Sequence, residues 1–239
     1  MIPKIVHYVW VGGPLPPYQQ SFVDTWRSSN PDYEFVLWNE QNIDFSTPMI
    51  REAYKHREWA KVADIVRLMA VAQQGGIYLD TDFRLFSSLD PVRVDKCFFA
   101  FQQEKRSGEW VGNAAFGAEA GNTFIRKALD GLLAMKKPLF GLENPTRYGP
   151  QHITRLLVEG GLQHYSPSGV KVGEVFVHPT PVFYPYHWTE KFTPDKMKSE
   201  TIGAHIWSDV PSWQGSLHPL IRFVRSSKRS IRKLIYRPL

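Results

Sequence analysis

The sequence predicts an α/β fold in which a mostly parallel β-sheet is flanked by helices, and three observations carry this prediction. Strand-like and helix-like apolar patterns alternate through the first half of the chain. A helical pattern ends at Gly75-Gly76 and leads at once into a short apolar strand at residues 77–79. The length of 239 residues suits one domain with a substantial core.

Each expected element has a local signal. Gly12-Gly13 ends a β-rich run, and an Asn-Pro-Asp turn at residues 30–32 ends the helix after it. The clearest helix has apolar residues at i, i+3, i+4 and i+7. The expected strands are residues 4–11, 33–39, 77–79 and 96–102, and the expected helices are residues 18–28, 47–56, 58–74, 122–136 and 151–159. The remainder up to residue 219 is expected to mix strand and loop.

The positive charge of the chain is concentrated at its C-terminal end. The net charge is +6, yet residues 220–239 carry seven basic side chains and no acidic one, which leaves −1 for the rest. This distribution argues against a body that binds nucleic acid over a broad face. We therefore divide the chain into a folded domain, residues 1–219, and a basic amphipathic tail, residues 220–239. The tail is predicted to bind an anionic membrane surface.

Cysteine content and hydropathy bear on the expected compartment. Cys97 is the only cysteine, so no intrachain disulfide can form, which is typical of a reducing compartment. The apolar run at the N-terminus is broken by Lys4 and His7 and is too short for a signal peptide. No later stretch reaches the ~18 apolar residues that span a bilayer. We expect a cytoplasmic protein, attached to the inner face of the membrane through its basic tail.

Two carboxylates, Asp80 and Asp82, follow the short apolar strand that begins after Gly75-Gly76. Residues i and i+2 of a strand share a face, so both side chains are expected to point into the crevice at the carboxyl end of the sheet. Two anions held so close repel each other unless a cation lies between them, and carboxylate oxygens suit Mn²⁺ or Mg²⁺. The plain alternative is a pair of solvated turn residues.

Other chemistries also use paired or single aspartates after a strand. Glycoside hydrolysis needs two carboxyl groups on opposite sides of the scissile bond, which neighbours on one strand do not provide. A metal-dependent phosphohydrolase with Asp80 as nucleophile stays open, although Arg84 stands where such enzymes usually have Thr or Val. A non-catalytic binder of nucleotide sugars also stays open, although a binder need not keep a costly pair of like charges.

Several motifs around this pair resemble glycosyltransferase family 32. Asp64, Arg67 and the run at residues 75–82 look like the sugar-binding region of that family, and residues 2–12 match the way its catalytic domains begin. The family includes fungal initiating α-1,6-mannosyltransferases and bacterial capsule or surface-polysaccharide enzymes, and it shares this signature with large glucosylating toxins. The resemblance is strong over residues 1–90 and weakens after that.

This resemblance implies a GT-A fold and a metal-dependent transferase that retains the anomeric configuration. The implied donor is a nucleotide sugar, either a UDP-hexose or GDP-mannose, and the implied cofactor is Mn²⁺ or Mg²⁺. The implied acceptor is a glycan or a lipid-linked sugar in the synthesis of surface polysaccharide. Because no side chain is an obvious nucleophile, the metal, Arg67 and the donor phosphate would carry the chemistry.

The resemblance also assigns roles to individual residues. Trp10 would stack on or flank the donor base, and the buried-strand role is the plain alternative. Asp64 and Arg67, one helical turn apart, would contact the donor sugar and its phosphate, and otherwise they form an exposed ion pair. Asp80 would hold the ribose or the metal, and Asp82 would hold the metal directly.

Further candidates lie later in the chain. Asn113 matches a family asparagine near the acceptor or the sugar. His205 is the best candidate for a third metal ligand, since imidazole binds borderline metals. Trp207, Ser212 and Trp213 lie where the family closes a lid over the donor.

The segment Tyr148-Gly149-Pro150 resembles a Thr-Gly-Pro loop of the family. Tyr148 replaces the threonine, so the role of that hydroxyl is not carried over.

Overall fold

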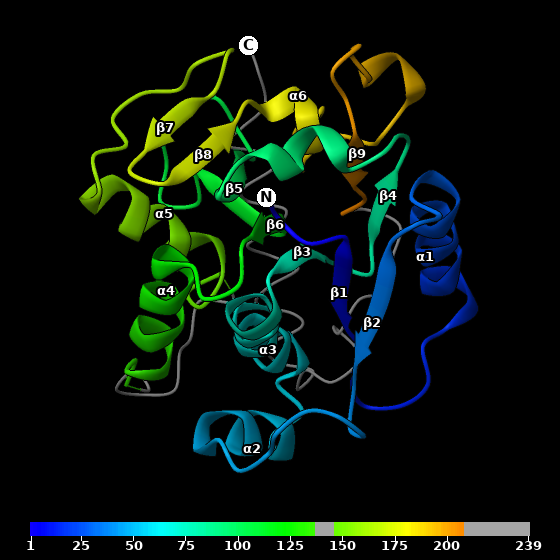
Figure 1. The fold of residues 1–239 in the computed structure, drawn as a ribbon, viewed down its shortest axis with the longest axis vertical. Helices are drawn as coiled ribbons and strands as arrows, with labels where there is room; N and C mark the ends of the chain where they lie inside the picture. The colour runs from blue at the N-terminus through cyan, green and yellow to red at the C-terminus, as the bar shows by residue number, and fades with distance from the viewer. Residues whose placement is uncertain (137–145, 208–239) are drawn as a thin grey trace.

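The computed structural model describes residues 1–136 and 146–207. Within this part of the chain, seven strands form one sheet in the order β2-β1-β3-β6-β5-β8-β7, and β4 pairs with β9 in a small second sheet (Figure 1). Five of these seven strands run in one direction, because β6 and β7 are antiparallel to their neighbours. The predicted α/β class with a mostly parallel sheet is confirmed.

The elements have the following bounds. The strands are β1 Ile5–Val9, β2 Glu34–Trp38, β3 Gly76–Leu79, β4 Phe83–Leu85, β5 Cys97–Phe101, β6 Val111–Ala118, β7 Val170–Val172, β8 Val175–His178 and β9 Gly203–His205. The helices are α1 Pro17–Ser29, α2 Pro48–Lys55, α3 Trp59–Gln74, α4 Thr123–Leu133, α5 Pro150–Glu159 and α6 Thr180–Phe183, with short 3-10 turns η1 Asp90–Val94 and η2 Pro194–Lys196.

Every strand and helix expected from the sequence is present, and no end differs by more than three residues from its expected position. Strand β6 was not expected, although it lies in the centre of the sheet. Its sequence is rich in Gly and Ala, which have low strand propensity. Packing explains this composition, because an added Cβ would come within 2.3 Å of the Tyr184 hydroxyl at Gly112 and within 2.7 Å of the Phe98 ring at Gly117.

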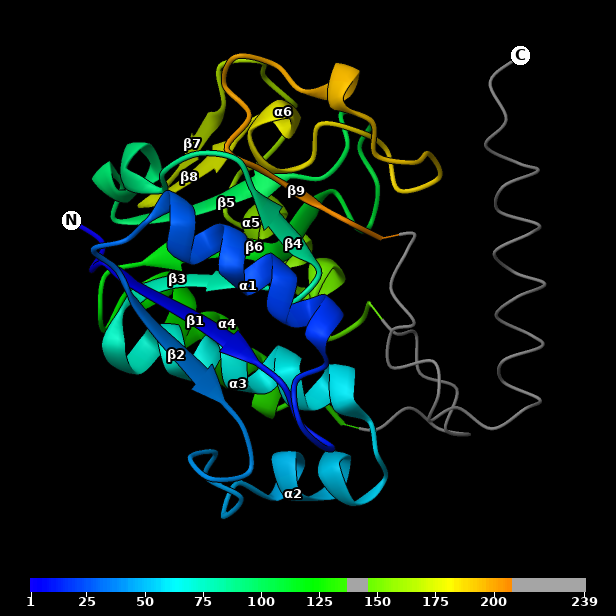
Figure 2. The ribbon, with the colours of Figure 1, turned by 90° about the vertical axis from the view of Figure 1, so that its right-hand side faces the viewer.

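The large sheet is covered on both faces. Side chains of α3, α4 and α5 pack with alternate strand residues in one apolar cluster, and side chains of α1, α6, β4 and β9 pack in a second cluster with the other strand residues. Figure 2 shows α1 and α3 on opposite sides of β1 and β3. The sheet is therefore the middle of three layers, and its carboxyl edge lies between the two flanking layers.

The junction between α3 and β3 allows β3 to pair closely with β1. Gly75 and Gly76 have φ values of 66° and 100°, a region that favours glycine. A Cβ at Gly76 would lie 2.7 Å from the Ile5 carbonyl oxygen, so β3 can approach β1 only because this residue is glycine. The buried imidazole of His7 contacts the Gly75 carbonyl oxygen through Nε2 at 2.8 Å. These contacts hold β3 parallel to β1.

Several sequence predictions fall outside the described residues. The basic tail at residues 220–239, the end of the predicted domain at residues 208–219, and the lid residues Ser212 and Trp213 all lie there. Among the described residues, no helix combines the length and the apolar character that a bilayer-spanning segment requires.

Candidate functional site

The aspartate pair lies at a turn directly after β3. The Asp80 amide still donates to the Ala114 carbonyl oxygen on β6, at 2.8 Å. The Phe83 amide then donates to the Asp80 carbonyl oxygen at 2.9 Å and closes a tight turn that contains Asp82. The expectation that both carboxylates share one strand face is therefore wrong for Asp82. The two side chains converge because the chain turns back on itself.

His205 completes a three-residue cluster with these aspartates. Strand β9 pairs antiparallel with β4, and this register places His205 opposite Phe83. His205 Nε2 lies 2.9 Å from Asp82 Oδ1 and 4.0 Å from Asp80 Oδ2. One ligand atom from each of the three residues lies within 4.8 Å of the others. Two carboxylate oxygens and one imidazole nitrogen suit Mn²⁺ better than Mg²⁺, which prefers oxygen ligands. These residues therefore fit the implied metal.

A second cluster, formed by Asp64, Arg67 and Asn113, lies beside the first and is deeply buried. Arg67 Nη2 lies 3.2 Å from Asp64 Oδ1, and the two side chains are 6% and 8% exposed. The Asn113 amide donates to Asp64 Oδ1 at 3.1 Å, and Arg67 Nη1 donates to the Asn113 carbonyl oxygen at 2.8 Å. The alternative of an exposed helical ion pair is therefore excluded for Asp64 and Arg67.

Arg67 also joins the two clusters. Its Nη2 lies 3.1 Å from Asp80 Oδ1, so one guanidinium contacts a carboxylate of each cluster. Asp80 and Asp82 are 23% and 24% exposed, far more than Asp64. The metal-type cluster is thus open to solvent, whereas the Asp64 cluster is closed.

Burial and neighbouring charges shift the titration of the site. Burial raises the pKa of Asp64 to about 6, against the opposing charge of Arg67 and with a further rise from Asp80. Burial also raises the pKa of Asp80, which Arg67 opposes and Asp82 reinforces. Burial alone would lower the pKa of His205, but the two facing aspartates outweigh it and the pKa is raised. Arg67 thus neutralises Asp64 and Asp80, whereas Asp82 pairs with His205, and three neighbouring carboxylates with one permanent cation favour a further cation.

The chemistry of this site agrees with the comparison to known families. Residues 16–99 match the model described as "Glycosyltransferase sugar-binding region containing DXD motif". The matched segment contains Asp64, Arg67, Asp80 and Asp82, and the last two are the acidic residues of the DXD motif. Residues 16–99 therefore carry a DXD-containing sugar-binding region of the kind found in glycosyltransferases. This match confirms the resemblance and argues against the phosphohydrolase alternative.

Curated relatives of this chain include fungal enzymes. The chain is 29% identical over 140 residues to inositol phosphoceramide mannosyltransferase 3 of Schizosaccharomyces pombe, a match that covers 55% of this chain and 37% of that protein. It is 26% identical over 137 residues to mannosyl phosphorylinositol ceramide synthase SUR1 of Saccharomyces cerevisiae, covering 55% and 35%. The matched region spans little more than a third of the length of these relatives.

A solved structure supports the fold. The PaToxG glycosyltransferase superposes with a TM-score of 0.54 at 18% identity, and the match covers 66% of this chain and 69% of that one. At this identity the likeness concerns the fold alone. It confirms the glycosyltransferase fold of GT-A type that the sequence resemblance implies.

Two tyrosines that sequence reasoning did not single out, and Gly149 of the predicted loop, also lie in this part of the structure. The Tyr78 hydroxyl donates to Asp80 Oδ1 at 2.7 Å. The Tyr184 hydroxyl accepts the Ala114 amide at 3.2 Å, next to Asn113. A Cβ at Gly149 would lie 2.6 Å from Asn113 Nδ2 and 3.0 Å from Asp64 Oδ1. Tyr78 could have been found, because it precedes Asp80 by two residues on the strand.

The two tryptophans expected at the donor follow different strands of the fold. Trp10 follows β1, which is parallel to β3, and therefore lies at the same edge of the sheet as Asp80. Its indole N–H donates to the Pro14 carbonyl oxygen at 3.1 Å. Trp207 follows β9, and its ring lies 4.9 Å from the His205 ring and 5.8 Å from the Tyr184 ring, centroid to centroid. No contact joins Trp10 and Trp207 among the described interactions.

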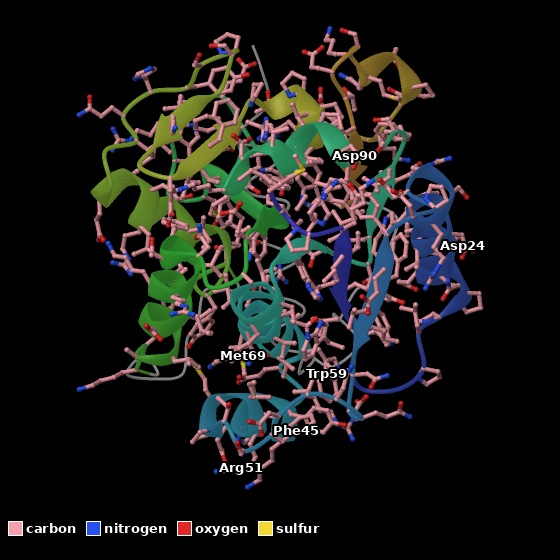
Figure 3. All side chains as sticks on the ribbon, in the orientation of Figure 1. Asp24, Phe45, Arg51, Trp59, Met69 and Asp90 are labelled. Atoms are coloured by element: carbon pink, nitrogen blue, oxygen red, sulfur yellow. The ribbon has the colours of Figure 1, made fainter. Side chains whose placement is uncertain are left out.

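The loop after Trp10 is held by residues near α2. The Gly12 amide donates to Glu40 Oε1 at 2.6 Å, and the Tyr54 hydroxyl donates to the same oxygen at 3.0 Å. A Cβ at Gly12 would lie 2.8 Å from the ring of Trp59, which is labelled with Phe45 in Figure 3 on the α2 side of the molecule. This loop therefore packs against aromatic side chains of α2 and the start of α3.

Proposed function

We propose that the chain transfers a hexose from a nucleotide-sugar donor to an acceptor hydroxyl, with a divalent Mn²⁺ or Mg²⁺ held by Asp80, Asp82 and His205. The observation that supports this most is the convergence of two carboxylates and one imidazole within 4.8 Å beside the buried Asp64–Arg67 pair. Such an ion, when bound, would neutralise the charge of the leaving nucleoside diphosphate.

The side chains around the ion have separate tasks in this proposal. Arg67 is fixed by Asp64, Asp80 and the Asn113 carbonyl, so its guanidinium is preorganised to meet the donor phosphate. Asp64 and the Asn113 amide would accept and donate hydrogen bonds to the hydroxyls of the donor sugar. Trp10 would flank the donor base, and Trp207 would help to cover the bound donor and exclude water.

Retention of the anomeric configuration is proposed without a covalent intermediate. Asp64 is held by the Asn113 amide and by Arg67, both through Oδ1, in an orientation that we propose serves to accept a hydrogen bond from the donor sugar rather than to attack it. We therefore assign no nucleophile. The leaving phosphate would take the acceptor proton while the acceptor attacks from the same face, with Arg67 stabilising the charge.

The names of the relatives bear on the finer identity of the proposed substrates. Both fungal relatives are named for mannose on an inositol-containing sphingolipid. GDP-mannose and UDP-hexoses are the proposed donors, and a glycan or a lipid-linked sugar of a surface polysaccharide is the proposed acceptor. A lipid-linked acceptor would suit attachment to the cytoplasmic face of a membrane through the basic tail at residues 220–239.

The test is a product assay with UDP-glucose, UDP-galactose and GDP-mannose, each with Mn²⁺ and with a chelator. One donor is expected to yield free nucleoside diphosphate in a Mn²⁺-dependent way, and a glycosylated product when acceptor is supplied. Asp82→Asn should lose this activity, whereas the exposed Asp130→Asn on α4 should keep it. Release of inorganic phosphate would instead indicate a phosphohydrolase, and donor binding without turnover would indicate a non-catalytic binder.

A further inference from the structure

Helix α1 supports the aspartate turn from the side opposite to β9. Trp26, a fully buried residue of α1, donates its indole N–H to the Phe83 carbonyl oxygen at 2.7 Å. One residue earlier on the helix, Thr25 Oγ1 accepts the Leu85 amide at 3.2 Å. Two successive side chains of α1 therefore bind the backbone just after Asp82.

Strand β9 binds the same turn from the other side. The Ile206 amide donates to the Asp82 carbonyl oxygen at 2.8 Å. The Phe83 ring stacks on the His205 ring, with centroids 6.1 Å apart and an interplanar angle of 17°. Phe83 therefore connects the two sides of the turn: its carbonyl oxygen accepts the hydrogen bond from α1, and its ring packs on His205.

This arrangement matters because a metal site tolerates little displacement. Ligand distances in working sites stay within about 0.2 Å of their preferred values. Asp82 lies in a turn and has no strand ladder of its own to fix it. Without the Trp26 bond, the Phe83 carbonyl would be a buried acceptor without a partner, and the turn would shift to find one.

We propose that Trp26 is a positioning residue of the metal site: its hydrogen bond to Phe83 holds Asp82 and His205 at the spacing that binds the divalent ion. The inference rests on the proposed function, because it assumes that the Asp80–Asp82–His205 cluster binds a metal. Trp26 itself contacts no ligand atom of that cluster in the described structure. Trp26 therefore affects metal affinity indirectly, through the position of the turn that contains Asp82.

The test is a titration of the full chain with Mn²⁺ alone, with free Mn²⁺ measured by electron paramagnetic resonance. Trp26→Phe keeps an aromatic ring in the core and removes the donor, and we expect about tenfold weaker Mn²⁺ binding. The matched control is Trp110→Phe, since Trp110 is also buried and donates its indole N–H to a backbone oxygen, that of Glu104, at 3.2 Å. Trp110→Phe should leave Mn²⁺ affinity within twofold of the parent chain.

A second variant covers the case in which Trp26→Phe does not fold. Thr25→Val keeps the shape of the half-buried side chain and removes the bond from the Leu85 amide, together with the bond that the hydroxyl donates to the Phe22 carbonyl oxygen within α1. We expect Mn²⁺ binding about threefold weaker. Unchanged affinity in Trp26→Phe, or in Thr25→Val if that is the variant available, overturns the inference. So does an equal loss in Trp26→Phe and Trp110→Phe, since that would reflect general destabilisation.

The same titration on Asp82→Asn separates this inference from the proposed function. If Asp82→Asn loses Mn²⁺ binding while Trp26→Phe keeps it, only the positioning role fails. If Asp82→Asn binds Mn²⁺ as well as the parent chain, the metal site itself fails, and the role of Trp26 fails with it.

Discussion

Two clusters of carboxylates and cations lie side by side in this protein and differ in their access to solvent. In the closed cluster, Asp64 and Arg67 are 8% and 6% exposed and hydrogen-bonded to Asn113. In the open cluster, Asp80, Asp82 and His205 are 23%, 24% and 13% exposed. The same residue chemistry therefore serves two purposes: the closed cluster holds a fixed arrangement, and the open cluster leaves room for a partner from solution.

The energetic consequences of the two clusters should differ in the same way. A buried ion pair that loses one partner leaves an uncompensated charge, which costs far more than an exposed pair does. A cluster that is open to solvent loses little stability when one charge is removed, but it loses the charge that a bound ion requires. Three substitutions and one binding measurement test this contrast, and a fourth substitution tests burial at a histidine outside both clusters.

The largest effect is expected for Arg67→Ala in the closed cluster. Removal of the guanidinium leaves Asp64 and Asp80 without their shared cation, and the free energy of unfolding should fall by about 3–5 kcal/mol. Chemical denaturation measures this loss. The control is Lys196→Ala, which breaks an exposed pair with Glu190 and should cost about 0.5 kcal/mol or less. Equal costs for the two variants would show that burial of Arg67 does not matter.

In the open cluster, Asp82→Asn should act on activity rather than on stability. Loss of one charged ligand is expected to lower turnover by about 10²–10³-fold, the range seen when one preorganised charge contact is removed. Because Asp82 is 24% exposed, the free energy of unfolding should change by about 1 kcal/mol or less. Turnover and denaturation are measured on the same preparation. A large loss of stability with normal turnover would reverse the contrast.

Gly149→Ala tests how tightly the closed cluster is packed. The added Cβ would lie 2.6 Å from Asn113 Nδ2 and 3.0 Å from Asp64 Oδ1, so one of these side chains must move. We expect a cost of about 1–3 kcal/mol in stability and at least tenfold lower kcat/KM. Gly108→Ala is the control, since a Cβ there meets nothing within 4 Å. Equal behaviour of the two variants would mean that the cluster adapts freely.

The smallest effect concerns a histidine outside both clusters. Burial lowers the pKa of His178 from 6.5 to about 4, whereas the aspartates raise that of His205. Because the folded-state pKa of His178 lies below the unfolded value, its stabilisation is complete above pH 6.5 and is lost as the pH falls towards 4. Between pH 7 and pH 4.5, the free energy of unfolding should therefore fall by about 2 kcal/mol less in His178→Phe than in the parent chain.

Denaturation curves at the two pH values measure this difference. The nearby Asp95 carboxylate, with Oδ2 3.6 Å from His178 Nε2, can only reduce it. An identical acid dependence in the variant and the parent chain would show that His178 titrates normally in the folded protein.

The sequence predicts the open cluster better than the closed one. Asp80 and Asp82 stand two residues apart in a recognisable context, and the family resemblance supplies His205. The deep burial of Asp64 and Arg67 could not be read from a helical spacing of three residues, because it depends on β6 and on Gly149 from distant parts of the chain. Strand β6 itself was hidden by its Gly and Ala residues, whose small size is dictated by Tyr184 and Phe98 rather than by local propensity.

The aspartate turn shows a second limit of sequence reasoning. A strand-face argument gives the correct convergence of Asp80 and Asp82 for the wrong reason. The turn is set by hydrogen bonds from Trp26 on α1 and Ile206 after β9, which lie more than fifty residues away from it in either direction. Such tertiary contacts leave no signal at the motif itself.

The most direct test of the contrast between the clusters is the thermal shift that Mn²⁺ produces in Asp64→Asn and Asp82→Asn, compared with the parent chain. A ligand at 100 times its dissociation constant stabilises the folded state by ~2.7 kcal/mol, which is readily measured. Asp64→Asn should keep the full Mn²⁺-induced shift, because the closed cluster does not bind the ion, and Asp82→Asn should lose it. A full shift in Asp82→Asn, or its loss in Asp64→Asn alone, would contradict the assignment of the metal to the open cluster.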